Sequence, residues 1–227
     1  MTKFALLMLY AVSGISHAGV VVGGTRFVFP SSAETRTISV TNTSNEPWLI
    51  NSKISAPTVW LGAVAFNGQP PILATPPLFL LPPGATGTIR LVKTGDLIPN
   101  DRETLFALSV ASIPSGRLED RSVKVALRSS FKLFWRPVSL KGDPEQAWQQ
   151  VTWRREPRGV MAENPTPFYI NLTQVTANGN PVNDAGVIPP LSQRHFTWCA
   201  AQTACTLRWR TLNDLGGLTP VNEQRLP

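Results

Sequence analysis

The chain has 227 residues, a formal net charge of +7 and an apolar fraction of 42%. This length allows one large β domain or two domains of roughly 100 residues, and the apolar content suffices for a core in each. The basic balance favours anionic partners in a general way, but the arginines are scattered along the chain. Because they form no basic stripe, a nucleic-acid partner is not expected.

The N-terminal residues predict a secretory signal peptide. Lys3 supplies one positive charge, residues 4–12 form a short apolar run, and residues 16–18 (Ser-His-Ala) make a small-x-small cleavage site. The run is too short and wrongly flanked for a membrane anchor. Removal of residues 1–18 takes away Lys3, which leaves an exported chain with a net charge of +6.

Cys199 and Cys205 are the two cysteines of the chain. In an oxidising compartment a disulfide between them is the default expectation. Closing so short a loop should stabilise the fold by about 2–2.5 kcal/mol in the chain-entropy model. A metal site is the weaker alternative, because the mature chain has only His195 to join the two thiolates. We expect no metal and no cofactor.

About seven short strands, separated by turns, are predicted before residue 138. Their ranges are 20–29 with a bulge or bend at Gly23-Gly24, 36–40, 48–54, 72–84, 88–92, 104–110 and 122–136. Range 72–84 should hold an edge strand and a turn, because its prolines cannot donate to a sheet ladder. No segment has a convincing helical period. This pattern is typical of a β-sandwich of immunoglobulin-like size.

A second β unit is predicted after a linker at residues 138–143. Its expected strands lie at 149–155, 159–163, 167–176, 194–198 and 205–211, with turns at 177–180 and 213–217. Their alternation is weaker than in the first unit. The sequence therefore predicts an all-β protein with an N-terminal domain over residues 19–137 and a C-terminal domain over residues 144–227.

The segment 122–137 carries the pattern from which a function can be argued. Val123, Val125 and Leu127 lie on one face of a predicted strand, and the residues between them lie on the other face. Apolar residues in this pattern would ordinarily cover the core of their own domain. The second half of the strand is apolar on both faces except for Lys132. Such a lysine either extends from an edge strand into solvent or lies in a cleft that receives an anion.

A series of short motifs along the mature chain resembles the periplasmic pilus chaperones of the PapD-like family. In chain order they are Thr25-Arg26, Ala74-Thr75-Pro76-Pro77, Leu81-Pro82-Pro83-Gly84, Ile89-Arg90-Leu91, Pro99-Asn100-Asp101-Arg102-Glu103-Thr104-Leu105-Phe106, Ile113-Pro114, Phe131-Lys132-Leu133-Phe134-Trp135-Arg136-Pro137, Glu163-Asn164-Pro165-Thr166-Pro167-Phe168-Tyr169 and Asn213-Asp214-Leu215-Gly216-Gly217. Each motif is weak alone, but their number and order are specific. The resemblance implies two immunoglobulin-like β-sandwich domains in an L-shape and a periplasmic location.

The resemblance also implies how such a protein binds its client. Arg26 and Lys132 match the cleft residues that bind the C-terminal carboxylate of a pilus subunit, although Arg26 alone would suggest an exposed strand arginine. Val123, Val125 and Leu127 match the strand that these chaperones lend to a subunit lacking its own last strand. The expected function is to bind, fold and cap pilus subunits by donor-strand complementation and to deliver them to an outer-membrane usher.

Further family features concern the domain junction and the partners. Arg90, Glu103 and Arg136 match an inter-domain ion network, which need not add net stability. The short segment from Ile113-Pro114 to Lys132 resembles the chaperones with a short F1–G1 loop, which serve rod-like adhesive pili. Without a client, the apolar edge strand is expected to support a self-capping homodimer, because exposed edges invite pairing.

Two features of the C-terminal half depart from the family pattern. The cysteine pair precedes Asn213-Asp214, whereas the resemblance implies a pair nearer the C-terminus. Only ten residues follow Gly217, so we expect the last strand to be abbreviated. Neither departure touches the cleft.

Two other classes of function compete with the chaperone. A serine hydrolase would need a Gly-x-Ser-x-Gly partner for His195, and the chain has none, so an enzyme is not expected. An immunoglobulin-like fimbrial subunit or adhesin would share the signal peptide and the β pattern. It would not require the pair Arg26 and Lys132 beside an alternating strand.

Overall fold

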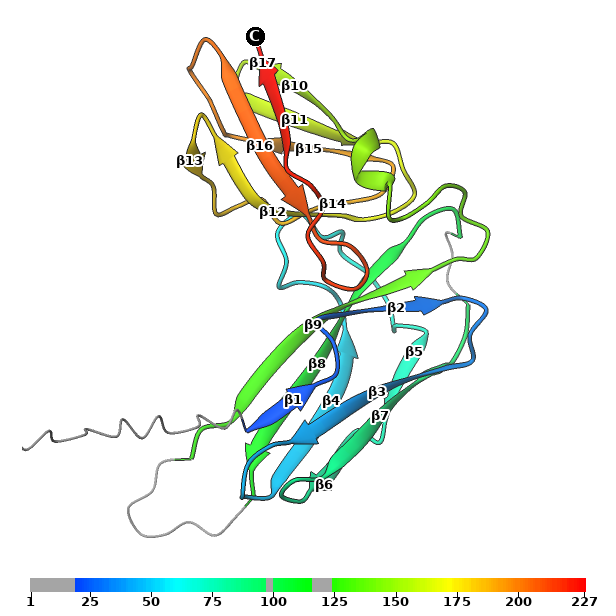
Figure 1. Ribbon diagram of the computed structural model, residues 1–227. Coiled ribbons are helices and arrows are strands. Elements are labelled where there is room, and N and C mark those ends of the chain that lie inside the picture. The colour runs from blue at the N-terminus through cyan, green and yellow to red at the C-terminus, as the bar shows by residue number, and fades with distance from the viewer. Residues whose placement is uncertain (1–18, 97–99, 116–123) are drawn as a thin grey trace, which may run out of the picture.

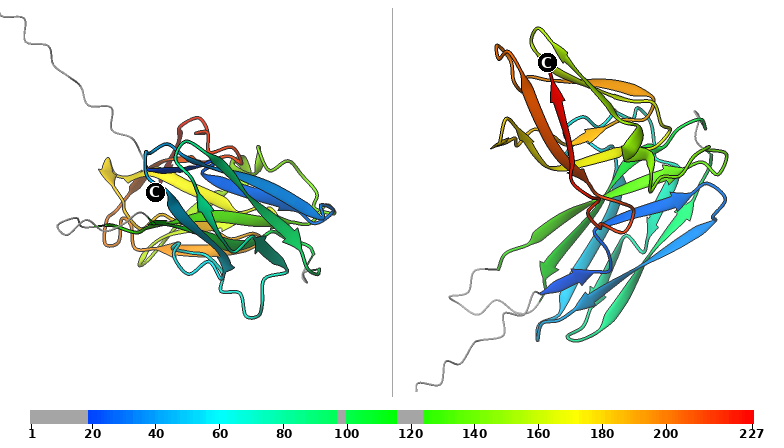
Figure 2. Two further views of the ribbon diagram at one scale, coloured as in Figure 1. Left: turned by 90° about the horizontal axis from the view of Figure 1, so that it is seen from below. Right: turned by 45° about the horizontal axis from the view of Figure 1, so that its top comes forward.

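The computed structural model describes residues 19–96, 100–115 and 124–227. The chain folds into two β-sandwiches that follow one another in sequence and meet at one end, with their long axes inclined (Figures 1 and 2). The described residues include one short 3₁₀ helix, η1 (Ala147–Gln150). The predicted all-β class is confirmed. The predicted signal peptide, residues 1–18, lies outside the described residues.

The first sandwich contains nine strands in two sheets. One sheet has the order β1-β3-β7-β5 and the other has the order β2-β9-β8-β4-β6. Their bounds are β1 (Val20–Val22), β2 (Arg26–Pro30), β3 (Thr35–Asn42), β4 (Trp48–Ser55), β5 (Ile72–Thr75), β6 (Leu78–Leu81), β7 (Thr86–Lys93), β8 (Thr104–Pro114) and β9 (Leu127–Arg136). Alternation explains these strands: in β3, Ile38 and Val40 are buried while Thr37 and Ser39 are exposed.

The predicted bend at Gly23-Gly24 is the point at which the chain passes from one sheet to the other. Before it, β1 pairs antiparallel with β3, and after it β2 pairs parallel with β9. Gly24 has φ +154°, and a Cβ on Gly23 would lie 2.2 Å from Ser39 Oγ. The backbone angle at position 24 therefore favours glycine, and position 23 packs closely against Ser39.

The proline-rich range 72–84 forms two edge strands rather than one. β5 ends the first sheet and β6 ends the second, so each strand has only one neighbour. Pro76 and Pro77 lie between them, where no ladder hydrogen bond is required of their nitrogen atoms. The expected edge strand is confirmed, and the turn that follows Thr75 moves the chain between sheets.

Strand β9 separates two apolar regions because successive side chains point to opposite faces. Phe131, Leu133 and Trp135 pack in the core of the first sandwich, where the Trp135 ring stacks on Phe29 with centroids 5.7 Å apart. On the other face, Phe134 packs against residues of the C-terminal half, among them Tyr169 and Val187. One strand thus belongs both to a domain core and to the junction between domains.

The second sandwich contains the sheets β10-β11-β15 and β13-β12-β16-β17, with β14 beside β12. Its strands are β10 (Thr152–Glu156), β11 (Gly159–Asn164), β12 (Ile170–Ala177), β13 (Asn180–Pro181), β14 (Val187–Ile188), β15 (Ser192–Phe196), β16 (Cys205–Thr211) and β17 (Asn222–Leu226). Its sheets share no strand with those of the first sandwich. The exact domain limits, 19–137 and 144–227, stay a prediction.

The C-terminal strand is present, although the sequence analysis gave it no residue range. β17 pairs along its whole length with Cys205–Trp209 of β16. Of its five residues only Leu226 is buried, so the apolar alternation that reveals other strands is missing. β17 has five residues and β16 has seven, which agrees with the expected short last strand. The bounds of β17 were not predicted, because backbone pairing rather than apolar burial defines this edge.

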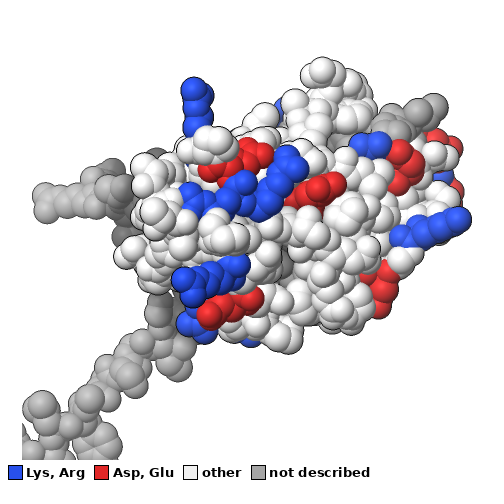
Figure 3. Space-filling view, turned by 90° about the horizontal axis from the view of Figure 1, so that it is seen from above, with Lys and Arg blue, Asp and Glu red and all other residues white. Residues whose placement is uncertain are grey.

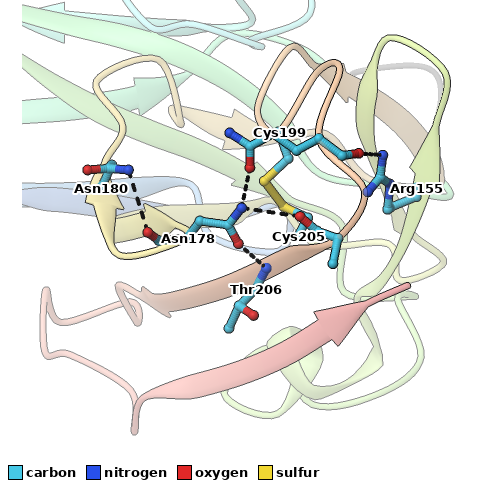
Figure 4. Close-up of a disulfide and its surroundings, with 8 residues drawn as sticks. Arg155, Asn178, Asn180, Cys199, Cys205 and Thr206 are labelled. Atoms are coloured by element: carbon cyan, nitrogen blue, oxygen red, sulfur yellow. Dashed lines mark hydrogen bonds between the residues drawn. A yellow bond between two sulfur atoms is a disulfide. The ribbon is translucent and has the colours of Figure 1, made fainter.

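The predicted disulfide between Cys199 and Cys205 is formed, with Cα atoms 5.7 Å apart. Hydrogen bonds hold the short loop that it closes (Figure 4). The Asn178 side chain donates to the Ala204 carbonyl at 3.2 Å and accepts from the Thr206 amide at 2.7 Å. The disulfide therefore fixes the end of β16 at a turn that side chains also stabilise.

Candidate functional site

Arg26 and Lys132 lie directly beside each other on neighbouring strands. In the parallel pairing of β2 with β9, Arg26 is the register partner of Lys132. Because partners in register project from the same face of a sheet, both cations leave the face that is turned toward the C-terminal domain. The structure thus brings together two residues that are remote in sequence and that the sequence analysis had paired.

Arg26 is not an exposed strand arginine, since only 8% of its surface is accessible. Its Nη1 donates to the Leu212 carbonyl of the C-terminal domain at 3.1 Å. Its Nε is buried without an acceptor among the described residues. Burial lowers the pKa of Arg26, and the nearby Asp214 carboxylate opposes this effect. The guanidinium is therefore held in place with donor capacity left for an anionic ligand.

Lys132 is half-buried and lies beside an aromatic ring. Burial lowers the pKa of Lys132 to about 8, and the adjacent charge of Arg26 acts in the same direction. Its Nζ lies 5.7 Å from the centroid of the Trp60 ring. Within the described ranges no carboxylate forms a salt bridge with it. Two adjacent, partly desolvated cations favour the binding of an anion between them.

The turn at residues 213–217 reaches down from the upper sandwich onto β2 and β9 (Figure 1). Asn213 Oδ1 accepts hydrogen bonds from the amides of Leu215, at 3.2 Å, and Gly217, at 2.7 Å. Gly216 has φ +86°, and a Cβ there would lie 2.5 Å from Thr25 Oγ1. This turn places the Leu212 carbonyl against Arg26, the register neighbour of Lys132.

An ion network behind the cleft joins the two domains. Arg136 Nε donates to Glu103 Oε1 at 2.6 Å, and its Nη1 and Nη2 donate to the two carboxylate oxygens of Asp214 at 2.6 and 2.9 Å. Glu103 Oε2 accepts from the Tyr169 amide at 2.8 Å. Both carboxylate oxygens of a buried glutamate are thus satisfied, one within its own domain and one from the other domain.

The membership of this network corrects the sequence prediction. Glu103 and Arg136 are confirmed as a pair, but Arg90 lies exposed on β7 of the other sheet, and no ion pair reaches it among the described residues. Asp214 takes the third position. Its signal in the sequence was the Asn213-Asp214 turn motif, which places an acid at the tip of a hairpin.

Burial dominates the electrostatics of this network. It raises the pKa of Glu103 to about 7, although Arg136 and the Tyr169 amide oppose the shift. Burial also acts to lower the pKa of Arg136, but its bonds to Asp214 and Glu103 raise it overall. Arg136 is therefore permanently charged, and its guanidinium is what allows a carboxylate to lie at this depth.

The lower half of β9 has a free edge. Residues 132–136 pair with β2 on one side, and residues 132–135 also pair with β8 on the other. Among the described residues, only β8 pairs with 127–131. Leu127 and Val125 are 61% and 59% exposed. The alternative that they cover the core of their own domain is therefore wrong. The strand begins at Leu127 rather than at 122, and Val123 lies outside the described residues.

Charges on the outer surface are mixed in sign. On the face seen from above, basic and acidic side chains lie next to each other with uncharged surface between them (Figure 3). Surface ion pairs such as Arg208 with Glu223, at 3.1 Å, follow this arrangement. Single pairs of this kind contribute little to stability. Arg26 and Lys132 differ from them because they are two adjacent cations, one buried and one half-buried.

The fold and the paired cations Arg26 and Lys132 point to a class of protein, and family comparison gives the same class. The N-terminal domain model of the pili and flagellar-assembly chaperones matches residues 19–141, and the C-terminal domain model of the pili assembly chaperone PapD matches residues 146–223. The chain belongs to the PapD family of pilus assembly chaperones. No helix of the described residues is long and apolar enough to cross a membrane.

Similar proteins cover nearly the whole chain. The uncharacterized fimbrial chaperone YcbF of Escherichia coli K12 is 57% identical over 99% of this chain and 95% of its own length. The chaperone FimC of the same strain is 31% identical over 95% of this chain and 88% of its own. A structure of the Salmonella enterica SafA pilin in complex with the SafB chaperone matches with a TM-score of 0.78 and 29% identity, over 90% of this chain and 95% of that chain.

Proposed function

We propose that this chain is a periplasmic chaperone that binds pilus subunits by donor-strand complementation, caps them and delivers them to an outer-membrane usher. The observation that carries the proposal is the register pairing of Arg26 with Lys132 at the end of a strand with a free apolar edge. The family membership supports it over residues 19–141 and 146–223. We propose no enzymatic activity, because the family is one of assembly chaperones.

The two cations form the proposed anchor for the C-terminal carboxylate of a subunit. A carboxylate taken out of water requires charge-assisted hydrogen bonds, and a guanidinium beside an ammonium offers several. Truncation of one partner in such a buried contact costs on the order of 2–5 kcal/mol of binding free energy. The orphan Nε of Arg26 is the donor for which the free protein supplies no acceptor among the described residues.

The free edge of β9 is the proposed binding surface for the subunit's backbone. From Leu127 to Lys132 the strand rises roughly 17 Å at about 3.3 Å per residue. A carboxylate fixed at Lys132 therefore fixes the register of every residue laid against this length. Leu127 and Val125 would each contribute about 1.5–3 kcal/mol when buried in the groove of a subunit. We propose the same role for Val123.

Without a client, the same edge is the proposed site of a self-capping homodimer. Leu127 is exposed beside a free backbone edge, and such edges pair with other chains unless they are covered. The alternative function, an immunoglobulin-like fimbrial subunit or adhesin, is not favoured, because both family models that match the chain describe assembly chaperones.

Co-expression in the periplasm with a pilus subunit encoded beside this gene tests the anchor. Wild type is expected to co-purify with the subunit as a soluble 1:1 complex, whereas Arg26→Ala and Lys132→Ala leave the subunit degraded. Lys53→Ala, which removes an exposed lysine of β4, is the matched control and should behave as wild type. Equal yields of complex from all four proteins would rule out the anchor.

The affinity for a carboxylate should depend on pH in a defined direction. Lys132 has a pKa of about 8 in the free protein, and a bound carboxylate raises it. Affinity is therefore expected to be constant below pH 8 and to fall about tenfold per pH unit above it. Fluorescence titration with a peptide that ends in the subunit's C-terminal sequence measures this profile. A flat profile up to pH 10 would contradict the role of Lys132.

A further inference from the structure

The loop between β4 and β5 contacts both Lys132 and the C-terminal domain. The Val187 amide donates to the Leu61 carbonyl at 2.9 Å. A Cβ on Gly62 would lie 2.2 Å from the Val187 carbonyl oxygen, and a Cβ on Gly186 would lie 2.2 Å from that of Leu61. The backbones of the loop and of β14 are thus in direct contact, which fixes the position of the loop.

Trp60 is the residue by which this fixed loop meets the cleft. Its side chain packs against the inter-domain cluster that includes Phe134, Tyr169 and Val187. Its ring lies under the ammonium of Lys132, with Nζ 5.7 Å from the ring centroid. The indole therefore packs against residues of both domains, and the Lys132 ammonium lies over its ring.

The charged groups around Lys132 explain why such a contact matters. Arg26, its register neighbour on β2, repels it, and its other register neighbour, Ala107 on β8, carries no charge. Asp214 acts on Arg26 and forms its salt bridge with Arg136. A cation over an indole ring is stabilised by the ring quadrupole. Among the described residues, the Trp60 ring is therefore the group that attracts the Lys132 ammonium in the client-free protein.

We propose that Trp60 is a positioning residue for Lys132, whose ring holds the ammonium charged and directed into the cleft before an anion arrives. The step from this contact to client affinity rests on the proposed function, but the contact itself does not. Trp60 touches the lysine rather than the carboxylate, so it acts on the client only through Lys132. The loop between β4 and β5, which carries Trp60, also contacts the C-terminal domain. It therefore links the proposed anchor to the position of that domain.

The first test needs no client. The ionisation of the Lys132 ammonium is followed by NMR with ¹³Cε-labelled lysine, and its resonance is assigned by its loss in Lys132→Arg. Trp60→Leu is expected to lower the midpoint by about 0.5–1 pH unit, and Trp60→Phe by less, because a benzene ring binds a cation more weakly than indole. Trp148→Leu makes the same change far from the cleft, at η1, and should leave the midpoint unchanged. An unchanged or raised midpoint in Trp60→Leu overturns the proposal.

The second test uses a peptide with the subunit's C-terminal sequence, once as the free acid and once as the C-terminal amide. Trp60→Leu should weaken binding of the free acid about threefold to tenfold at pH 8.5, less at pH 6, and should leave binding of the amide unchanged. A loss that is equal at both pH values, or shared by Trp148→Leu, assigns the effect to packing and overturns the proposal. If wild type fails to distinguish acid from amide, the proposed anchor fails, while the NMR titration still decides the contact.

Discussion

Arg136→Met is expected to destabilise the protein by about 1–2 kcal/mol at pH 8 and by more at higher pH, because it removes the counter-charge of a buried carboxylate. Glu103 keeps only 2% of its side-chain surface exposed, and Arg136 is the cation that contacts it. Urea unfolding followed by tryptophan fluorescence measures the loss. The exposed pair of Arg208 with Glu223 supplies the control, since Glu223→Gln should change the free energy of unfolding by less than about 1 kcal/mol.

The cost of Arg136→Met should grow with pH. In the fold the pKa of Glu103 is already raised above its ordinary value of 4.5, and loss of Arg136 raises it further. The unfolded chain then releases this proton at a lower pH than the folded one. The stability of the variant therefore declines as the pH rises above about 4.5. Wild type shares this decline up to the folded pKa of about 7, so the difference between the two proteins widens above pH 7 and is small in acid. The double variant Arg136→Met, Glu103→Gln should recover much of the loss at pH 8. A loss that persists in the double variant would show that packing, not charge, explains it.

Leu127→Glu is expected to abolish complex formation with a subunit while leaving the fold of the free protein unchanged. The side chain is 61% exposed, so the substitution should alter the free energy of unfolding by no more than about 0.5 kcal/mol. In the proposed complex the same position would have to bury a carboxylate in an apolar groove, which is strongly unfavourable. Co-purification and thermal unfolding of the two proteins, measured side by side, separate binding from stability.

The control for Leu127→Glu is Leu78→Glu on β6, which makes the same change at a 51% exposed site of the same sheet. It should retain the complex. Sedimentation equilibrium of the client-free proteins extends the test, because Leu127→Glu should also shift any self-capped dimer to monomer. If Leu127→Glu still binds the subunit, the proposal that β9 is the donor strand is wrong. If the wild type stays monomeric at high concentration, only the proposed homodimer is ruled out, and the proposed donor strand is not affected.

Much of the fold could be predicted from apolar alternation. The predicted range 205–211 coincides with β16, where Cys205, Leu207 and Trp209 alternate with more exposed residues. The pattern failed at β17, where four of the five residues are polar or charged, and at the two-residue strands β13 and β14, which are too short to show a period. Backbone pairing alone defines these elements, and it leaves little trace in composition.

The functional site, too, could be predicted only in part from the sequence. Lys132 was recognisable because a lone cation interrupts an apolar strand, and Arg26 only through the family motif. Their register pairing depends on a parallel contact between strands distant in sequence, which no local pattern specifies. Trp60 was missed for the same reason, since it lies in a loop without periodicity and meets the lysine only in the folded chain.

The passage of the chain between sheets at Gly23-Gly24 also sets the polarity of the proposed complex. β2 runs parallel to β9 and begins at Arg26, where the free edge of 127–131 ends. A subunit strand that lies on this edge with its carboxylate at Lys132 must run in the direction of β9 as well. The guest strand and β2 would then follow one another head to tail along a single line, like one strand with a nick. The two cations lie at that nick, so the anchor marks where the guest ends and the host resumes.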